Sequence, residues 1–233
     1  MVRRDVQLAP AAEGGIGIDW GVKTTATTTD PAYDLPYGGH RKRCAAELAK
    51  AQRKMARRRR PRGHAQSKGY QPAKPETAKV YKKASRQTRH DGLQWADRVV
   101  ANYDLIAVED FKPTFLAKTT MARKAADAAI GGVKPTLIER GMRAGRTVVL
   151  VPPAYTTMTC SSCGSRAKTR LALAERTFVC TSCGLLEGRD TNAARTILAT
   201  AERGRASVDD LSHSVPSPRA SGSMQSELEI PCL

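Results

Sequence analysis

Residues 14–30 read GGIGIDWGVKTTATTTD, a stretch that predicts two strands paired through a tight turn. Gly and Ile alternate over residues 15–18 of a strand expected at about 15–20, and the β-branched residues of 22–29 favour extended backbone. Asp19 lies inside the first of these strands, between the apolar Ile18 and Trp20. Because a packed strand rarely carries a charge at such a position, this hairpin is a candidate for function as well as for fold.

Hydrophobic periodicity and Pro/Gly punctuation place the other elements. We expect helices at residues 42–60, 77–102, 120–130, 135–143 and 190–201, strands at 105–110 and 146–151, and a flexible loop at 61–76. The Ser-rich residues 204–233 are expected to be disordered. Strands interleaved with helices in this way indicate an α/β or α+β domain.

Length and charge limit the classes of protein to which the chain can belong. Its 233 residues allow one main domain with a small module, and a net charge of +17 favours nucleic acid as a partner. No apolar run approaches the ~18 residues of a membrane-spanning helix, and the first residues lack the apolar core of a secretory signal. We therefore expect a soluble, cytoplasmic protein that is associated with the nucleoid through nucleic-acid binding.

Most of the positive charge lies in residues 41–90, which hold 18 Lys and Arg against two acids. The densest run falls on the helix expected at 42–60 and consists of Arg53, Lys54, Arg57, Arg58, Arg59 and Arg60. Such a run is either a solvated face or a contact for nucleic-acid backbones. In the second case binding weakens steeply with salt, because neutralised phosphates release counterions. These contacts position a strand without reading its sequence.

Four of the six cysteines form two CxxC pairs separated by 16 residues: Cys160 and Cys163, then Cys180 and Cys183. Four thiolates at this spacing can hold one Zn²⁺ tetrahedrally. Gly164 and Gly184 follow the pairs, where a knuckle turn needs a permissive backbone. Reduced cysteines without metal and an iron–sulfur cluster are the alternatives. Because all four ligands would come from the protein, the expected zinc is structural and not catalytic.

Three carboxylates stand where a packed domain rarely places charge. Asp19 lies in the first strand, Glu109 ends the strand at 105–110, and Asp190 opens the helix after the cysteines. Carboxylates that converge from separate elements can hold two Mg²⁺ ions, as a metal-dependent nuclease requires. Each residue also has a simpler interpretation. Asp19 can be a hairpin residue, Glu109 a solvated strand end, and Asp190 a helix N-cap.

Five motifs follow one another between residues 14 and 203. They are Gly17-Ile-Asp-Trp-Gly-Val-Lys23, Leu105-Ile-Ala-Val-Glu-Asp-Phe111, Thr159-Cys-Ser-Ser-Cys-Gly164, Phe178-Val-Cys-Thr-Ser-Cys-Gly184 and Arg189-Asp-Thr-Asn-Ala-Ala-Arg-Thr-Ile-Leu198. In type and order, they resemble the C-terminal half of the OrfB/TnpB family. These insertion-sequence-encoded proteins are usually called transposases and are similar to the type V CRISPR effectors.

The resemblance implies a RuvC-type nuclease domain with the RNase H fold, interrupted by a four-cysteine zinc ribbon. Its RuvC segments would be residues 1–40, 103–154 and 188–203, with a basic helical segment at 41–102, the ribbon at 155–187 and a tail at 204–233. The family's two Mg²⁺ ions are bound by an Asp, a Glu and an Asp, which fall on Asp19, Glu109 and Asp190. Family members act as RNA-guided DNA endonucleases, so DNA and a guide RNA are the implied partners.

About 13 residues precede the first motif, whereas full-length family members carry roughly as many residues again in domains that grip RNA and recognise the target. We therefore expect the nuclease half of a transposon-associated endonuclease, without its recognition half. The alternatives are a catalytically silent nucleic-acid-binding zinc-ribbon protein and a truncated element product with no selected function. The sequence leaves the oligomeric state open.

Overall fold

The computed structural model describes residues 14–169, 171–172 and 175–213. Its strands are β1 (Gly15–Trp20), β2 (Thr24–Thr28), β3 (Leu35–Pro36), β4 (Leu105–Glu109), β5 (Thr147–Val151), β6 (Thr177–Val179) and β7 (Leu186–Gly188). Its helices are α1 (His40–Arg43), α2 (Ala45–Arg58), α3 (Tyr70–Asn102), α4 (Ala122–Ala128), α5 (Ile130–Arg143) and α6 (Arg189–His213). Short 3₁₀ turns lie at η1 (Pro31–Tyr33) and η2 (Pro113–Lys118). No helix in these ranges is long and apolar enough to cross a membrane.

A five-stranded sheet in the order β3-β2-β1-β4-β5 forms the centre of the fold. The expected hairpin is present as β1 and β2, which pair antiparallel, and β3 extends it. The two strands expected further along the chain are β4 and β5, and both run parallel to β1. The mixed α/β class expected from the sequence is confirmed. A separate two-stranded ribbon, β6-β7, belongs to the cysteine module.

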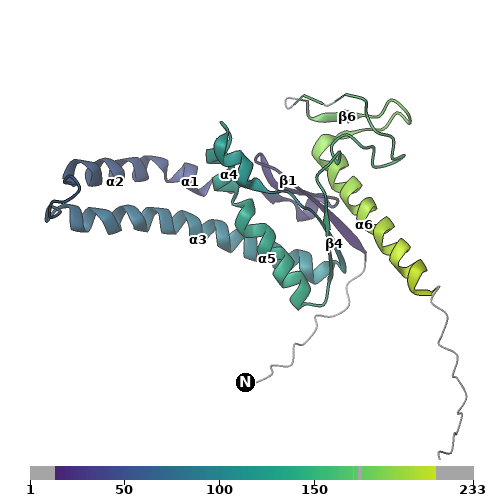
Figure 1. The fold of residues 1–233 in the computed structure, drawn as a ribbon, viewed down its shortest axis with the longest axis horizontal. Helices are drawn as coiled ribbons and strands as arrows, with labels where there is room; N and C mark the ends of the chain where they lie inside the picture. The colour runs from purple at the N-terminus through teal and green to yellow at the C-terminus, as the bar shows by residue number, and fades with distance from the viewer. Residues whose placement is uncertain (1–13, 170, 173–174, 214–233) are drawn as a thin grey trace, which may run out of the picture.

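One face of this sheet is covered by α3 and α5 (Figure 1). Because side chains alternate along a strand, every second residue of β1 points to this side, including Ile18 and Trp20. They pack with Trp95, Val99 and Leu137 in the main hydrophobic core. The rings of Trp20 and Trp95 meet edge to face, with their centroids 6.0 Å apart.

The opposite face of the sheet is covered by α6, which runs across β1 (Figure 1). A small apolar cluster joins them and contains Ala107, Val151 and Ile197. The backbones approach closely here. A Cβ added to Gly17 would lie 2.0 Å from the carbonyl oxygen of Ala194. Only glycine at position 17 therefore allows α6 to take this place.

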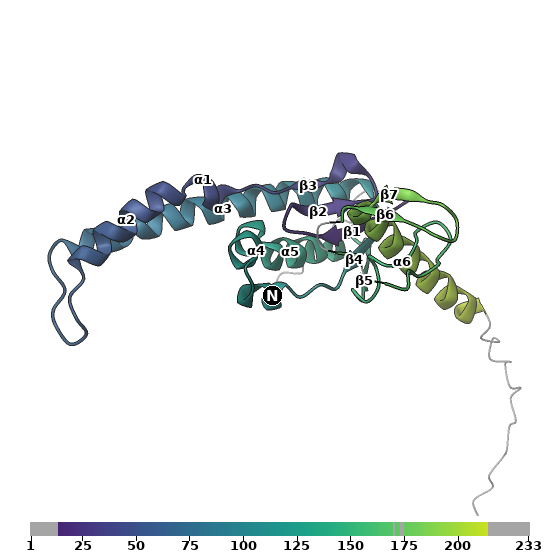
Figure 2. The same ribbon diagram turned by 90° about the horizontal axis from the view of Figure 1, so that it is seen from above.

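The basic segment forms a helical hairpin of α2 and α3 that extends away from the sheet (Figure 2). The two helices pack through small side chains, with Ala51 and Ala73 buried. The ammonium of Lys54 on α2 lies 2.6 Å from the carboxylate of Glu76 on α3. Because this pair is solvent-exposed, it adds little stability by itself, and most of the hairpin's cations remain at its surface.

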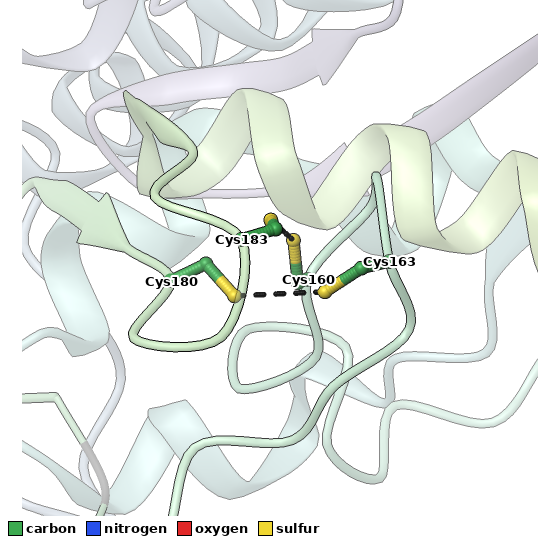
Figure 3. A group of neighbouring side chains, drawn as sticks. All are labelled: Cys160, Cys163, Cys180 and Cys183. Carbon is green, nitrogen blue, oxygen red and sulfur yellow. Dashed lines mark hydrogen bonds between the residues drawn. The ribbon is translucent and has the colours of Figure 1, made fainter.

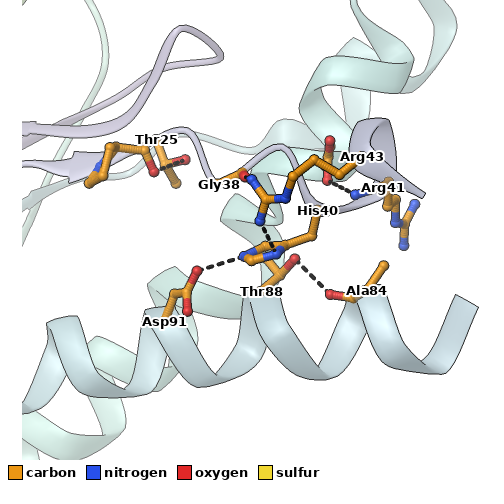
Figure 4. A network of polar contacts seen from close by, with 10 residues as sticks. Thr25, Gly38, His40, Arg41, Arg43, Ala84, Thr88 and Asp91 are labelled. Atoms are coloured by element: carbon orange, nitrogen blue, oxygen red, sulfur yellow. Dashed lines mark hydrogen bonds and ion pairs between the residues drawn. The ribbon is translucent and has the colours of Figure 1, made fainter. Parts of the chain in front are cut away.

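His40 fastens the base of the hairpin to the core (Figure 4). Its Nε2 lies 2.6 Å from Asp91 Oδ2, and its Nδ1 lies 2.6 Å from Arg43 Nη2. A guanidinium can only donate, so Nδ1 accepts from Arg43. The proton of the ring is then on Nε2, which donates a hydrogen bond to Asp91. Asp127 on α4 accepts hydrogen bonds from the Arg41 backbone N–H and the Tyr37 hydroxyl. The hairpin therefore leaves the core and returns to it at one fixed point.

Several helix boundaries differ from the sequence expectation. The helix expected at 42–60 is divided at Cys44 into α1 and α2. The next helix begins at Tyr70 and not at residue 77, so part of the loop expected at 61–76 is helical. Proline is tolerated in a first turn, where N–H groups have no intrahelical acceptor. Packing against α2 compensates for the hydrogen bond that Pro75 cannot make.

The break expected at Gly131-Gly132 lies instead at Ala129, whose φ is +50°. This left-handed residue ends α4, and both glycines fall in the first turn of α5. At the other end of the chain, α6 continues to His213 through residues expected to be disordered. Gly204 costs about 1 kcal/mol relative to Ala, but extending an existing helix needs no new nucleus. Residues 214–233 of the expected tail lie outside the described residues.

Candidate functional site

The carboxyl ends of β1 and β4 bring two of the three predicted acids together. The strands are parallel and pair Ile18 with Val108, so the next residues, Asp19 and Glu109, lie side by side. Since Ile18 and Val108 point into the main core, both acids point to the face covered by α6. Asp19 is 8% exposed and Glu109 is 5% exposed. Their carboxyl groups hydrogen-bond to each other.

Two further donors hold Glu109 in place. The Thr156 hydroxyl lies 3.2 Å from Glu109 Oε1, and the backbone N–H of Trp20 also donates to this carboxylate. Burial raises the pKa of Glu109, while these hydrogen bonds oppose the shift. Thr156 is itself buried and was not predicted as a site residue. Its position in the Thr-rich stretch after two prolines gave no signal of this contact.

Asp190 lies in the first turn of α6, close enough for its charge to act on Asp19. The pKa of Asp19 is held well above its usual range, first by burial and then by the negative charges of Glu109 and Asp190. Asp190 is more open than the other two, and its carboxylate lies 3.5 Å from the guanidinium groups of Arg189 and Arg176. The close approach of α6 at Gly17 is what brings Asp190 to this edge of the sheet.

The chemistry of these donors fits a divalent cation. Two buried carboxyls, with a third acid near them, gather oxygen donors at one edge of the sheet, and oxygen ligands are those that Mg²⁺ prefers. Their oxygens do not all lie within 4.8 Å of one another. Among the described residues, the four cysteines are the one group of three or more potential ligands that does. The acids are therefore gathered but less tightly clustered than the cysteines.

The four predicted cysteines converge on one point (Figure 3). The sulfur atoms of Cys160 and Cys183 are 3.6 Å apart, as are those of Cys163 and Cys180. Four thiolates at ~2.3 Å from a tetrahedral Zn²⁺ would be about 3.8 Å from one another, so the cluster has the size for this ion. Hydrogen bonds from the backbone N–H groups of Cys183 and Ser182 lower the pKa of Cys180 to about 6, which favours the thiolate.

The two knuckles have the same backbone pattern. Cys160 N–H donates to Ser165 O, and Cys180 N–H donates to Leu185 O, both at 2.9 Å. Gly164 and Gly184 have φ of +72° and +76°, so the glycines predicted to allow these turns do so.

Asn192 joins the first knuckle to α6. Its side chain accepts from the Ser161 N–H at 2.9 Å and donates to the Thr159 carbonyl at 2.8 Å. It is completely buried. The Thr196 hydroxyl, one turn later on the same side of α6, also donates to the Thr159 carbonyl. The signal for this contact was present in the sequence, because two polar residues four apart face inward beside Ala193 and Ile197.

The predicted basic residues are all exposed on and just after α2: Arg53, Lys54, Arg57, Arg58, Arg59 and Arg60. Helix α2 ends at Arg58, so the last two lie in the turn that follows. Lys54 has an ion-pair partner in Glu76, and Arg58 donates to the Gly69 carbonyl. These cations lie on the projecting hairpin and not around the carboxylates (Figure 2).

Two family models match the chain. Residues 3–118 match OrfB_IS605, described as "Probable transposase", and residues 135–197 match "Cas12f1-like, TNB domain". A Streptomyces pristinaespiralis protein named "Putative RNA-guided DNA endonuclease" is 31% identical over 194 residues, which are 82% of this chain and 46% of that protein. Escherichia coli "Putative RNA-guided DNA endonuclease InsQ" is 29% identical over 201 residues, 79% of this chain and 48% of its own length. The chain thus spans about half the length of these relatives.

The fold also resembles a solved structure, the "Cas12f1-sgRNA-target DNA complex", with a TM-score of 0.54 and 16% identity. That match covers 78% of this chain and 49% of the Cas12f1 chain. The chain therefore has a mixed α/β fold similar to that of Cas12f1 and carries a four-cysteine cluster in position to bind a metal. The chain belongs to the OrfB/TnpB family of transposase-type proteins.

Proposed function

We propose that this chain is the nuclease portion of a transposon-associated DNA endonuclease of the RuvC type. The observation that carries the proposal is the buried Asp19–Glu109 pair at the carboxyl ends of two parallel strands, with Asp190 beside it. The names of the relatives support DNA as the substrate and a guide RNA as a partner of the full-length protein. The reaction is hydrolysis of a phosphodiester bond.

Asp19, Glu109 and Asp190 would hold two Mg²⁺ ions in this scheme. When bound, such ions lower the pKa of a coordinated water and stabilise the charge that develops on the leaving 3′-oxygen. The protein's own contribution is positioning. Thr156 and the Trp20 N–H orient Glu109, and α6 presents Asp190 next to Asp19.

The division of the chain follows the same proposal. Residues 1–40, 103–154 and 188–203 are assigned to the RuvC-type domain with the RNase H fold, 41–102 to a basic insertion and 155–187 to a zinc ribbon. The mixed sheet supports the first assignment, since β1, β4 and β5 are parallel while β2 and β3 are antiparallel. The exposed cations of the α2–α3 hairpin support contacts to DNA or RNA backbones.

Cleavage of single-stranded DNA by the purified chain in Mg²⁺ tests the proposal. Asp19→Ala and Asp190→Ala should each abolish cleavage, because each removes a ligand of the proposed ions. Glu139→Ala is the matched control, since Glu139 is an exposed acid paired with Arg143 on α5, and this variant should cleave as the wild type does. Cleavage that survives in both Asp variants contradicts the assignment.

The zinc assignment is tested separately by metal analysis and thermal unfolding. We expect about one Zn²⁺ per chain and a large destabilisation of the Cys163→Ser variant, because structural zinc binding is part of the folding free energy. Cys44→Ser is the control, since Cys44 lies between α1 and α2, outside the cluster. A zinc content near zero in protein purified without chelator argues against the site.

A second function, nucleic-acid binding without catalysis, is favoured by the separation of the basic hairpin from the carboxylates (Figure 2). It requires salt-sensitive binding of DNA and RNA but no Mg²⁺-dependent turnover. The cleavage assay with the wild-type chain decides between the two functions, because turnover excludes the silent binder.

A further inference from the structure

Tyr155 is an exposed aromatic residue that immediately precedes Thr156, the residue in contact with Glu109. Its side chain is 51% exposed, and the next residue in the chain is Thr156, which donates to Glu109. An exposed side chain at Tyr155 is therefore followed directly by a buried one at Thr156, which contacts Glu109. The ring takes no part in the proposed Mg²⁺ or Zn²⁺ sites.

The backbone at Tyr155 is held in a conformation that side chains rarely adopt. Its φ is +68°, in the left-handed region, where a bulky residue is uncommon and strained. Three hydrogen bonds fix the turn, because the Tyr155 carbonyl accepts from Met158 N–H, Thr159 N–H and the Thr159 hydroxyl at 2.9–3.0 Å. Strain of this kind persists where the surrounding structure enforces it, and such sites are often functional.

The cysteine module supplies a cation over this ring. The guanidinium carbon of Arg166 lies 2.8 Å from the ring centroid of Tyr155. Arg166 is placed there by an isolated antiparallel bridge to Thr159, next to the first knuckle. Half of the tyrosine surface stays open even with this contact. Arg176 and Arg189 lie 3.5 Å from the Asp190 carboxylate. Cations therefore lie next to one of the acids, and an aromatic ring lies one residue from the Thr156 contact of another.

We propose that Tyr155 is a stacking platform for one unpaired base of the DNA strand that enters the carboxylate site, and this inference rests on the proposed nuclease function. Base–aromatic stacking is tolerant of sequence and is typically combined with cations that follow the backbone. A base held on Tyr155 would fix the strand beside Glu109, because Thr156 links the two. The left-handed turn keeps the ring at the surface, and Arg166 limits its rotation.

Binding of a short single-stranded DNA, measured by fluorescence anisotropy without Mg²⁺, tests this contact. A strand of about six nucleotides at near-physiological salt limits the contribution of the basic hairpin. Tyr155→Leu should weaken binding about 5- to 100-fold, the range of one lost stacking contact. Tyr155→Phe and Tyr155→Trp should bind within about threefold of the wild type, because both keep an aromatic face.

An abasic strand of the same length separates stacking from a general effect on the fold. Wild type and Tyr155→Leu should bind the abasic strand equally, since no base is present to stack. The inference is overturned if Tyr155→Leu binds the base-bearing strand as the wild type does, or if it loses affinity equally for both strands. Cleavage is measured separately. If the wild type does not cleave, the nuclease proposal is contradicted. The base contact is still supported in that case if Tyr155→Leu loses base-dependent binding.

Discussion

The two faces of strand β1 are built from residues of different size. Toward α3 and α5 it presents Ile18 and Trp20, which fill the main core. Toward α6 it presents Gly17 and Asp19, and the helix backbone touches the strand backbone. The main core and the candidate site therefore use alternate residues of one strand. Large apolar side chains bury area on one face, while the absence of a side chain on the other face brings an acid on a distant helix within reach.

The largest effect is expected when the close approach is blocked. Gly17→Val places a side chain where the Ala194 carbonyl oxygen lies, and we expect a loss of about 3 kcal/mol or more from the free energy of unfolding. Ile18→Val, the next residue and on the other face, removes one methylene from the core and should cost about 1 kcal/mol. Urea unfolding measures both. If the two substitutions lower the free energy of unfolding equally, contact with the α6 backbone does not restrict the side chain at position 17.

An intermediate effect is expected at the joint between α6 and the first knuckle. Asn192→Leu removes the acceptor of the Ser161 N–H and the donor to the Thr159 carbonyl at a fully buried position, which should cost about 2 kcal/mol. Zinc content should be unchanged while cleavage falls, because Asp190 loses its support. Asn102→Leu is the control, since Asn102 is exposed at the end of α3 and should change stability by less than ~0.5 kcal/mol. Loss of zinc from Asn192→Leu would show that the knuckle, and not α6, depends on this residue.

The smallest effect is a gain in stability at the site itself. Burial and neighbouring charges raise the pKa of Asp19, so in Mg²⁺-free protein the folded state keeps a proton that the unfolded state has lost. Stability therefore falls as pH rises from the usual carboxyl pKa through the raised one. Asp19→Asn has no carboxyl to ionise, so its free energy of unfolding at neutral pH should be about 1 kcal/mol higher than that of the wild type. Near pH 4 the two proteins should differ little. If the difference in free energy of unfolding is the same at both pH values, it does not arise from the ionisation of Asp19.

Local patterns predicted the parts of this molecule that depend on neighbours in sequence. The hairpin followed from the alternation around Ile18, and the cysteine cluster followed from two short spacings that fix their own turns. The three acids were proposed as a set from their unusual positions, and the resemblance to a family strengthened that hypothesis. The sequence alone could not show their proximity, since Asp19 and Glu109 are brought together only by strand pairing across 90 residues. The structure places Asp19 beside Glu109 and brings Asp190 close enough for its charge to act on Asp19, and their role as metal ligands remains the proposal.

Contacts that depend on three-dimensional packing were not predictable in the same way. Nothing local to Thr156 indicates that it will meet Glu109, because the contact requires β4 and β5 to be paired first. The α3 boundary was wrong because the Pro, Gly, Ser and Gln residues of 61–76 were interpreted as a loop. Pro72 falls in the first turn of α3, where it is tolerated, and packing against α2 compensates for Pro75 inside the helix. The break between α4 and α5 was wrong because glycines were weighed more heavily than the packing that fixes Ala129.

The clasp of His40 and Asp91 has a consequence for how the chain can vary. The fifty residues between His40 and Asp91 project from the core, and the two side chains at their ends hydrogen-bond to each other. The distance between these ends therefore does not depend on the length of the projecting segment. Paired additions or deletions of whole turns in α2 and α3 would lengthen or shorten the arm while the sheet keeps its register. The length of the projecting arm and the geometry of the sheet edge can therefore vary independently.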